Sequence, residues 1–201
     1  DQAATTNYGP TTTLMKITVD PLPPNLSSPN YTVRYGDPAF SIINSVTTSS
    51  SGTLIFQRGS WRNFEIDANS GVVTSTSAGT GFITIVQPSD GCYGSDVVFP
   101  SLTVLKGSCT LTSVNVTKTY GDLNFVLDNV TTSSSGSYTF TSNPPAIVSI
   151  NNTTSNTTIN RAGTSTVSLT QYSDGNYESC TTTFTITVFK ADPTITTTNT
   201  V

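Results

Sequence analysis

The chain has 201 residues and a formal net charge of −4, and only 10% of its residues are charged. It has no basic cluster or run of like charges, which excludes the electrostatic surface of a nucleic-acid-binding protein. No apolar stretch is long enough to span a membrane, and no signal peptide is visible. We therefore expect no nucleic-acid partner and no membrane insertion, and we expect any targeting signal to lie outside this sequence.

The sequence is a tandem repeat with an offset of 84 to 85 residues. Residues 78–95 and 162–179 share nine identities in eighteen positions, including the motifs Ala-Gly-Thr and Ser-Asp-Gly-x-Tyr. Residues 46–52 recur unchanged at 130–136. Because self-similarity at a fixed period is a better guide to domain number than length, we expect two small domains.

The repeat pattern and a proline-rich linker at 21–24 divide the chain into four predicted parts. These are the final strand of a preceding repeat (1–21), a first immunoglobulin-like repeat (22–106), a second repeat (107–191) and the first strand of a following repeat (192–201). The first part is predicted from Met15, Ile17 and Val19, which align with the apolar positions of the last strand in both repeats.

Short runs of alternating apolar and polar residues, bounded by Gly, Pro, Asn or Ser, fill both repeats. No helical periodicity is present. The pattern predicts an all-β chain of two antiparallel β-sandwiches in tandem, each with about seven strands, arranged as a rod. The side chains expected to face the two cores are Phe40, Leu54, Phe56, Ile83, Ile85, Leu102 and Val104, and then Phe125, Tyr138, Phe140, Val167, Leu169, Ile186 and Val188.

Four motifs recur in a fixed order: Tyr-Gly-Asp followed by an aromatic residue, the Ala-Gly-Thr strand, Ser-Asp-Gly-x-Tyr, and Phe-Thr-Ile-Thr-Val-x-Lys-Ala-Asp-Pro at 184–193. This set resembles the immunoglobulin-like and mostly-beta glycine-rich (MBG) repeats of giant surface proteins, found in bacterial adhesins and in appendages of phages and large viruses. The resemblance covers 107–191 well and 22–106 less well. It implies a structural stalk, fibre or adhesin array, located extracellularly or on a cell or virion surface, whose partners are neighbouring repeats of the same chain.

The chain contains no histidine, which excludes Ser-His-Asp and Cys-His catalysis. Glu65 and Asp67 lie two apart on one predicted strand, and a solvated pair is favoured over a glycosidase pair. We therefore expect no enzyme activity and no cofactor. Four aspartates at predicted turns are candidate calcium ligands, although capping of their own turns is the favoured interpretation. They are Asp37, Asp90, Asp122 and Asp174.

Trp61 is the single tryptophan, and Arg58 and Arg62 flank it. An exposed tryptophan beside cations could stack on a sugar, whereas a buried one would cover the end of the core. This region provides the alternative function, in which the first repeat is a binding module for a surface glycan or a protein receptor.

The three cysteines are Cys92, Cys109 and Cys180. In a sandwich of seven strands with alternating directions, the first strand begins at the end where the last hairpin turns. Cys109 and Cys180 should therefore lie at one end of the second repeat and form a disulfide, which leaves Cys92 free. Seven Asn-x-Ser/Thr sequons are candidate N-glycosylation sites. They begin at Asn25, Asn30, Asn115, Asn129, Asn151, Asn152 and Asn156.

Overall fold

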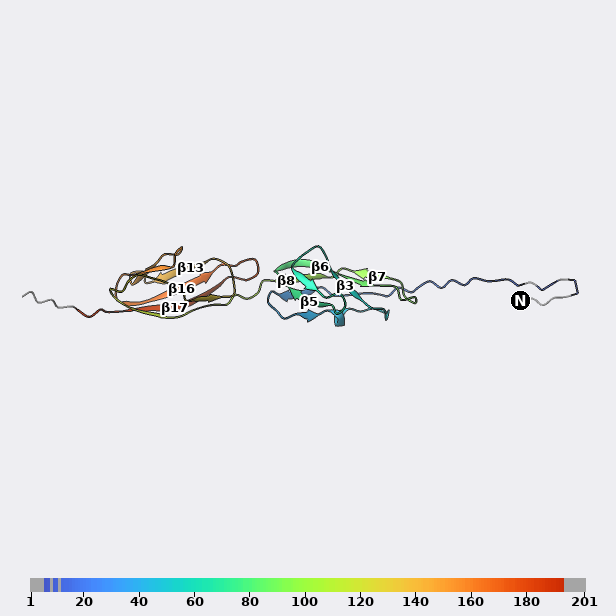
Figure 1. Cartoon of the computed structure of the whole chain (residues 1–201), viewed down its shortest axis with the longest axis horizontal. Helices are drawn as coiled ribbons and strands as arrows, with labels where there is room; N and C mark the ends of the chain where they lie inside the picture. Colours follow the sequence, from blue (N-terminus) through green and yellow to red (C-terminus); the bar gives the residue numbers. More distant parts are fainter. Residues whose placement is uncertain (1–5, 8, 11, 194–201) are drawn as a thin grey trace, which may run out of the picture.

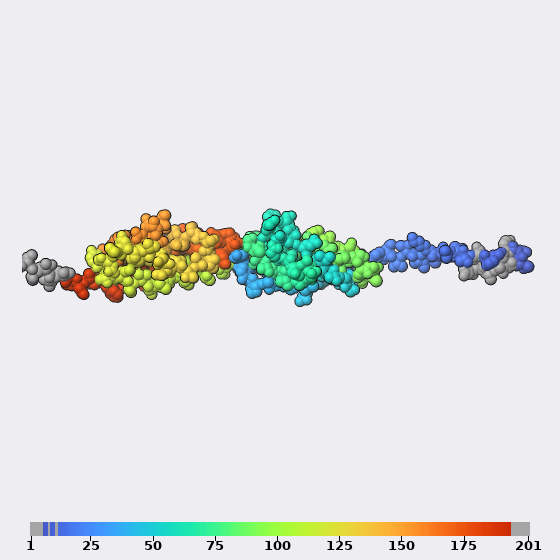
Figure 2. Space-filling view, viewed as in Figure 1, coloured from blue at the N-terminus to red at the C-terminus, as the bar shows by residue number. Residues whose placement is uncertain are grey.

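The computed structural model describes residues 6, 7, 9, 10 and 12–193. These residues form β-strands and one short 3-10 helix, η1 (Ile43–Ser45), and they contain no α-helix. None of the helical structure in this part of the chain could cross a bilayer. Two β-sandwiches follow one another along a single long axis (Figures 1 and 2). The predicted all-β, tandem immunoglobulin-like fold is confirmed.

The first repeat contains two sheets. In one, the strand order is β1-β8-β6-β3, with β7 also paired to β6, and in the other it is β2-β5-β4. The strands are β1 (Tyr31–Arg34), β2 (Phe40–Ser41), β3 (Ile55–Arg58), β4 (Phe64–Ile66), β5 (Val72–Ser75), β6 (Gly79–Gln87), β7 (Asp96–Val98) and β8 (Ser101–Leu105).

The second repeat reproduces this arrangement, with sheet orders β10-β17-β16-β13 and β11-β15-β14 and an additional pair, β12-β9. Its strands are β9 (Leu111–Ser113), β10 (Val116–Thr119), β11 (Phe125–Val126), β12 (Val130–Thr132), β13 (Tyr138–Asn143), β14 (Val148–Ile150), β15 (Asn156–Ile159), β16 (Gly163–Gln171) and β17 (Cys180–Phe189).

The last strand is continuous in the second repeat and broken in the first. Pro100 stands between β7 and β8, at the position that Phe184 occupies inside β17. Proline has no N–H to donate to a ladder, so a strand that pairs along its whole length cannot pass through it. The Pro100 carbonyl still accepts a hydrogen bond from the Ile83 N–H at 3.0 Å, which keeps the broken strand against β6.

In each repeat, the largest sheet contains one parallel pair, formed by the strands that come first and last in the chain order of that sheet. β1 pairs with β8, and β10 pairs with β17, whereas the other strand pairs are antiparallel. A chain whose first and last strands share a direction enters the sandwich at one end and leaves it at the other. This connectivity produces the end-to-end arrangement in Figure 1.

Each sandwich has its own hydrophobic core. One cluster is centred on Phe56, Phe64 and Ile83, and the other on Phe140, Leu169 and Ile186. Most of the predicted inward side chains are buried, and Phe40, Leu54 and Phe125 are partly buried against the clusters. In β17, Ile186 is fully buried while its neighbours Thr185 and Thr187 are half-buried, so the predicted register is correct.

The prediction for Tyr138 is wrong, because 37% of this residue is exposed. It stands at the beginning of β13, on the same face as Phe140 but beyond the end of the core. Its ring packs edge to face on Phe140, with centroids 5.6 Å apart, and thereby covers the core without entering it.

The described part of the N-terminal segment has no strand pairing of its own before Leu22. Residues 12–20 form no strand in the structure, and the apolar side chains Leu14, Met15, Ile17 and Val19 are exposed. The segment runs away from the first repeat along the axis of the rod (Figure 1). The strand predicted at 192–201 lies, from residue 194 onward, outside the described residues.

Candidate functional site

The two repeats meet at a joint, which we define as the contact of Tyr35, Ala78, Lys106 and Gly107 with residues 173–178. The first repeat contributes its Tyr-Gly-Asp turn, the start of the Ala-Gly-Thr strand and the linker. The second contributes the Ser-Asp-Gly-x-Tyr turn between β16 and β17. Tyr35 and Tyr177 pack edge to face across the joint, with ring centroids 5.3 Å apart.

Backbone hydrogen bonds fasten the linker to the turn. The Gly107 N–H donates to the Asn176 carbonyl at 2.8 Å, and the Glu178 N–H donates to the Gly107 carbonyl at 3.0 Å. Gly107 and Tyr177 thereby form a parallel β-bridge. From the first repeat, the Ala78 N–H donates to Oδ1 of Asn176 at 3.0 Å. The linker is therefore an ordered, hydrogen-bonded connection between the repeats.

Lys106 adds charged contacts to the same turn. Its ammonium donates to Oγ of Ser173 at 2.5 Å and to the Asp174 carbonyl at 2.6 Å, and its own carbonyl accepts from Arg34 Nη1 at 3.1 Å. Gly107 is needed for close approach, since a Cβ at this position would lie 2.5 Å from the Tyr35 carbonyl oxygen.

The outer end of the first repeat carries the same bridge between linker and turn. The Leu22 N–H donates to the Cys92 carbonyl at 2.9 Å, and the Gly94 N–H donates to the Leu22 carbonyl at 2.8 Å. Leu22 is the counterpart of Gly107 at an offset of 85 residues. The bridge is thus a property of the repeat, formed each time a linker enters it.

The aspartates of the Ser-Asp-Gly-x-Tyr turns cap those turns. Oδ1 of Asp174 accepts from the N–H groups of Asn176 and Tyr177, both at 2.7 Å, and Oδ2 accepts from Ser134 Oγ and the Ser135 N–H, both at 2.9 Å. These hydrogen bonds hold the pKa of Asp174 well below its usual range, and the bond from the Tyr177 N–H has the largest effect. Asp174 therefore shapes the turn that the joint uses.

Asp90 plays the same part in the first repeat. Its Oδ1 accepts from the Tyr93 and Cys92 N–H groups and its Oδ2 from Ser50, and the bond from Tyr93 is the main cause of its lowered pKa. Asp37 and Asp122 accept from the N–H groups of Arg34 and Thr119, both at 2.8 Å. The structure thus places all four calcium candidates in separate turn caps, and the described residues contain no cluster of three metal-ligating side chains.

The predicted carboxylate pair is occupied by other partners. Glu65 forms an ion pair with Arg58. Asp67 lies just beyond the end of β4 and accepts from the Ser70 N–H at 2.7 Å, which is the main cause of its lowered pKa. The two side chains therefore serve an ion pair and a turn.

Trp61 is 60% exposed and lines a surface hollow of ≈ 250 Å³ together with Arg62, Asn63 and residues 77–80. Arg58, which the sequence placed beside it, is instead turned toward Glu65 and the Phe64 carbonyl. Asn63 is 6% exposed, and its Oδ1 has no hydrogen-bond partner. The sequence reasoning missed Asn63, which stands where the second repeat has the apolar Ile147.

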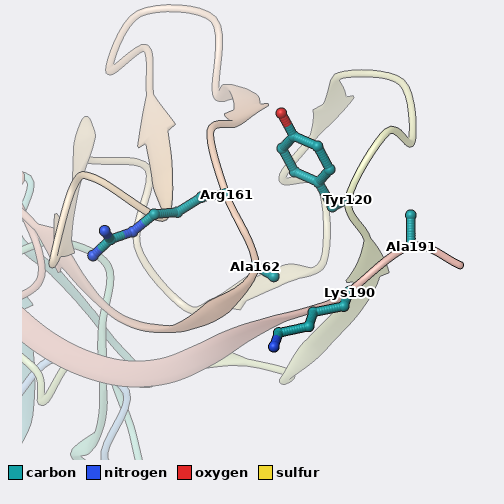
Figure 3. A pocket seen from close by; sticks show the side chains of 5 residues that line it. All are labelled: Tyr120, Arg161, Ala162, Lys190 and Ala191. Atoms are coloured by element: carbon teal, nitrogen blue, oxygen red, sulfur yellow. The ribbon is translucent and has the colours of Figure 1, made fainter. Parts of the chain in front are cut away.

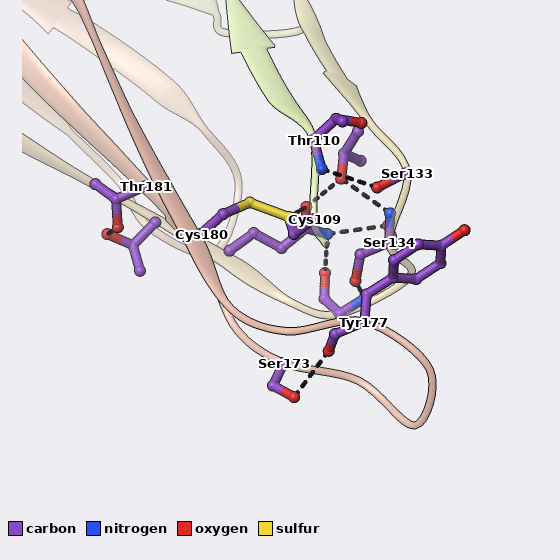
Figure 4. The surroundings of a disulfide bond; sticks show 12 residues. Cys109, Thr110, Ser133, Ser134, Ser173, Tyr177, Cys180 and Thr181 are labelled. Carbon is purple, nitrogen blue, oxygen red and sulfur yellow. Dashed lines mark hydrogen bonds between the residues drawn. A yellow bond between two sulfur atoms is a disulfide. The ribbon is translucent and has the colours of Figure 1, made fainter. Parts of the chain in front are cut away.

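Cys109 and Cys180 form a disulfide, with Cα atoms 5.8 Å apart, and Cys92 is free and exposed, as predicted. Figure 4 shows the bond linking the segment before β9 to the start of β17, next to the turn that carries Ser173 and Tyr177. The disulfide therefore ties the linker side of the second repeat to the strand that follows the joint turn.

All seven sequon asparagines are exposed. Four of them use Oδ1 to accept backbone N–H groups in the structure: Asn30, Asn115, Asn151 and Asn152. Glycan attachment at any of the seven stays a prediction.

The joint residues were not predicted as a site from the sequence. The signal lay in the repeat itself, because Tyr35 and Tyr177 belong to two motifs that recur in both repeats. Each motif recurs at an end of the repeat, and ends of repeats in a linear array face their neighbours.

No protein-family model matches the chain, and no curated protein matches it significantly. Among solved structures, it is similar to Drosophila N-cadherin EC1-4, with 12% identity, a TM-score of 0.39 and 84% of this chain covering 50% of that chain. For human protocadherin-24 EC1-2 the identity is 10%, the TM-score 0.34 and the coverage 85% of this chain and 99% of that chain. For Sidekick-1 immunoglobulin domains 1-4 the identity is 11%, the TM-score 0.31 and the coverage 83% of this chain and 51% of that chain.

This chain thus spans about half the length of the N-cadherin and Sidekick-1 fragments. The similarity to tandem cadherin-like and immunoglobulin-like sandwiches is distant, and the fold assignment rests on the strand pairing of the chain itself.

Proposed function

We propose that the chain is a structural segment of an extracellular or surface-exposed stalk, fibre or adhesin, related to the MBG-type repeats that its motifs resemble. The observation that carries this proposal is the parallel pairing of the first and last strands in each repeat. Tension applied along the rod pulls β1 toward one end of the first repeat and β8 toward the other. All hydrogen bonds of that ladder are then loaded together, in shear, whereas peeling would break them one at a time.

The joint supports the same proposal. A repeat that transmits force along a stalk, or keeps the stalk extended, needs an ordered connection to its neighbour. The linker provides this connection, because Lys106 and Gly107 form hydrogen bonds with both repeats. The disulfide adds a covalent tie between the start of the second repeat and β17. Disulfides persist in oxidising compartments, which favours an extracellular location.

Single-molecule pulling of the whole chain from its two ends tests this proposal. We expect the first repeat to unfold in one event at a force well above that needed for peeling, whereas the disulfide keeps residues 110–179 of the second repeat out of the path of the force. Val33→Pro should lower the force of this event, because the strand alternation that directs the Tyr35 N–H to the Leu105 carbonyl also directs the Val33 N–H into the ladder with β8. Thr32→Pro is the matched control, since its N–H points away from β8. If the unmodified first repeat unfolds at the force of the Val33→Pro variant, the stalk proposal is wrong.

A second candidate function is glycan binding at the Trp61 hollow. It is favoured by the exposed indole, by Arg62 and by the unpartnered Oδ1 of Asn63 in the wall. Aromatic faces and convergent polar groups are the usual composition of a sugar site. The single tryptophan of the chain makes its fluorescence a direct reporter. Titration with oligosaccharides should give a saturable change that Arg62→Ala weakens, and an unchanged spectrum across a glycan panel would exclude this function.

A further inference from the structure

The far end of the second repeat carries a hollow of ≈ 370 Å³ lined by five residues, which we call the end face. They are Tyr120, Arg161, Ala162, Lys190 and Ala191. Figure 3 shows Tyr120 and Lys190 on either side of Ala162, with Ala191 at the chain's exit from the repeat. These residues come from the Tyr-Gly-Asp turn, the segment that leads into β16 and the segment that follows β17.

The end face corresponds residue by residue to the side of the joint that the first repeat provides. At offsets of 84 to 85, its five residues are the counterparts of Tyr35, Ser77, Ala78, Lys106 and Gly107. Four of these counterparts contact the Ser-Asp-Gly-x-Tyr turn of the second repeat. The end face is therefore one half of a joint whose complete form is present elsewhere in the same molecule.

The residues of the joint are more buried than their counterparts at the end face, as this correspondence requires. In the joint, Tyr35 and Lys106 are half-buried and Gly107 is buried, whereas at the end face Tyr120, Lys190 and Ala191 are exposed. Tyr120 is 50% exposed. On the first repeat this surface is covered by the second repeat, whereas the corresponding surface of the second repeat, the end face, is exposed.

We propose that the end face is the docking site for the Ser-Asp-Gly-x-Tyr turn of a further repeat that follows directly in the same chain. The tyrosine of that turn packs edge to face on Tyr120, and the Ala162 N–H donates to the side chain of the residue at x. Lys190 donates to the turn as Lys106 does. This inference rests on the proposed function, since it extends the array of a stalk by one joint.

The hydrogen bonds of the linker distinguish between two possible occupants of the end face, a following repeat and a second copy of this chain. In the joint, Gly107 supplies both backbone bonds of the bridge to the turn. In another copy, the corresponding turn at 89–93 already receives its bridge from that copy's own Leu22. Ala191 of a first copy would find that edge occupied. The observations therefore favour an occupant that is continuous with Ala191.

Charge and sterics refine the fit. Arg161 replaces Ser77 while Thr119 stands at the position of Arg34, so the end face presents two cations, Arg161 and Lys190, to a turn that contains aspartate. Ala191 replaces Gly107, whose Cβ would lie 2.5 Å from the Tyr35 carbonyl oxygen. The following repeat must therefore sit slightly farther from Tyr120 than the second repeat sits from Tyr35.

The test is an extended chain in which a second copy of residues 108–191 is fused after Ala191. We expect hydrogen exchange at the Ala162 amide to slow by about fivefold to tenfold relative to the unextended chain, as one added hydrogen bond of ordinary strength implies. Ala191→Gly should preserve or increase this effect. Tyr120→Ala should remove it, and Leu123→Ala is the matched control because that exposed residue lies near the end face but outside its lining.

Unchanged exchange at Ala162 in the extended chain would overturn the inference, as would slowing that survives Tyr120→Ala. Slowing that appears in the unextended chain as its concentration rises would assign the end face to contacts between copies and would also overturn it. Pulling the two-repeat chain remains an independent test of the stalk proposal, so failure of one is distinguishable from failure of the other.

Discussion

Tyr35 of the first repeat and Tyr177 of the second pack edge to face, with ring centroids 5.3 Å apart, at the junction of two independent hydrophobic cores. An edge-to-face pair contributes about 0.5–1.5 kcal/mol beyond the area that it buries. Around it, backbone bonds from Gly107 and Ala78 fix the turn that carries Tyr177. These contacts therefore restrict the orientation of the two repeats relative to one another. With a flexible linker, the same groups would be exposed to water.

Gly107→Ala should loosen this joint. The added Cβ would meet the backbone oxygen of Tyr35, which cannot move without shifting β1, and so the linker or the turn must give way. Gly175→Ala is a matched control, because a Cβ there meets nothing within 4 Å. We expect faster hydrogen exchange at the Ala78 amide in the first variant only. Equal exchange in the two variants would mean that close approach at Gly107 is not required.

Loss of the disulfide should destabilise the second repeat and leave the first unchanged. Closing a loop of 71 residues between Cys109 and Cys180 constrains the unfolded chain. In the chain-entropy model this constraint contributes about 4 kcal/mol. We expect the double variant Cys109→Ala/Cys180→Ala to unfold in two separated transitions, followed by tryptophan fluorescence for the first repeat and by circular dichroism for both. Cys92→Ala is the control, and a similar loss in that variant would contradict the assignment.

The joint should weaken in acid through Asp174. Its pKa is depressed in the folded chain, so its stabilising contribution is complete above the unfolded value of about 3.9 and is lost as the pH falls toward the lower folded value. Protonation removes the negative charge from the carboxylate that accepts the Asn176 and Tyr177 N–H groups, and thereby weakens both hydrogen bonds. We expect the Ala78 amide to lose protection between about pH 4 and lower values, measured after correction for intrinsic exchange.

Asp174→Asn should remove this pH dependence, whereas Asp90→Asn should not, because Asp90 shapes the turn at the outer end of the first repeat. An unaltered acid response at Ala78 in the Asp174→Asn variant would show that another group controls the turn.

Two buried glutamines at equivalent positions should respond differently to substitution by leucine. Nε2 of Gln171 donates to the Ser134 and Gly136 carbonyls at 3.0 and 2.8 Å, whereas neither side-chain polar atom of Gln87 has a hydrogen-bond partner. Gln171→Leu should cost about 1–3 kcal/mol in the free energy of unfolding, because it strands buried acceptors. Gln87→Leu should be close to neutral. Denaturant unfolding of each variant measures both values, and equal costs would contradict the assigned bonding.

The architecture could be predicted from sequence because it depends on local and periodic signals. Alternation in residues 184–188 fixes which side chains face the core, and the constant offset identifies two copies of one unit. The disulfide followed from strand direction alone. Tyr138 was misjudged because alternation identifies a face of the sheet and does not say where along the strand the core ends.

The candidate sites were less predictable, because they depend on contacts between distant residues. Arg58 pairs with Glu65 across two strands instead of flanking Trp61, which composition around the tryptophan could not reveal. Asn63 enters the hollow because the neighbouring segment 77–80 folds against it. The joint unites Tyr35 with Tyr177, and only the three-dimensional arrangement of the repeats brings these two motifs together.

Residual dipolar couplings of the backbone amides in the intact chain test the central claim most directly, since they report the orientation of each repeat in a common frame. If the joint holds the repeats in one orientation, a single alignment tensor will fit the couplings from 22–106 and 107–191 together. Two tensors of different magnitude and direction would show that the repeats reorient independently, and this result would contradict the account of the chain as an ordered rod.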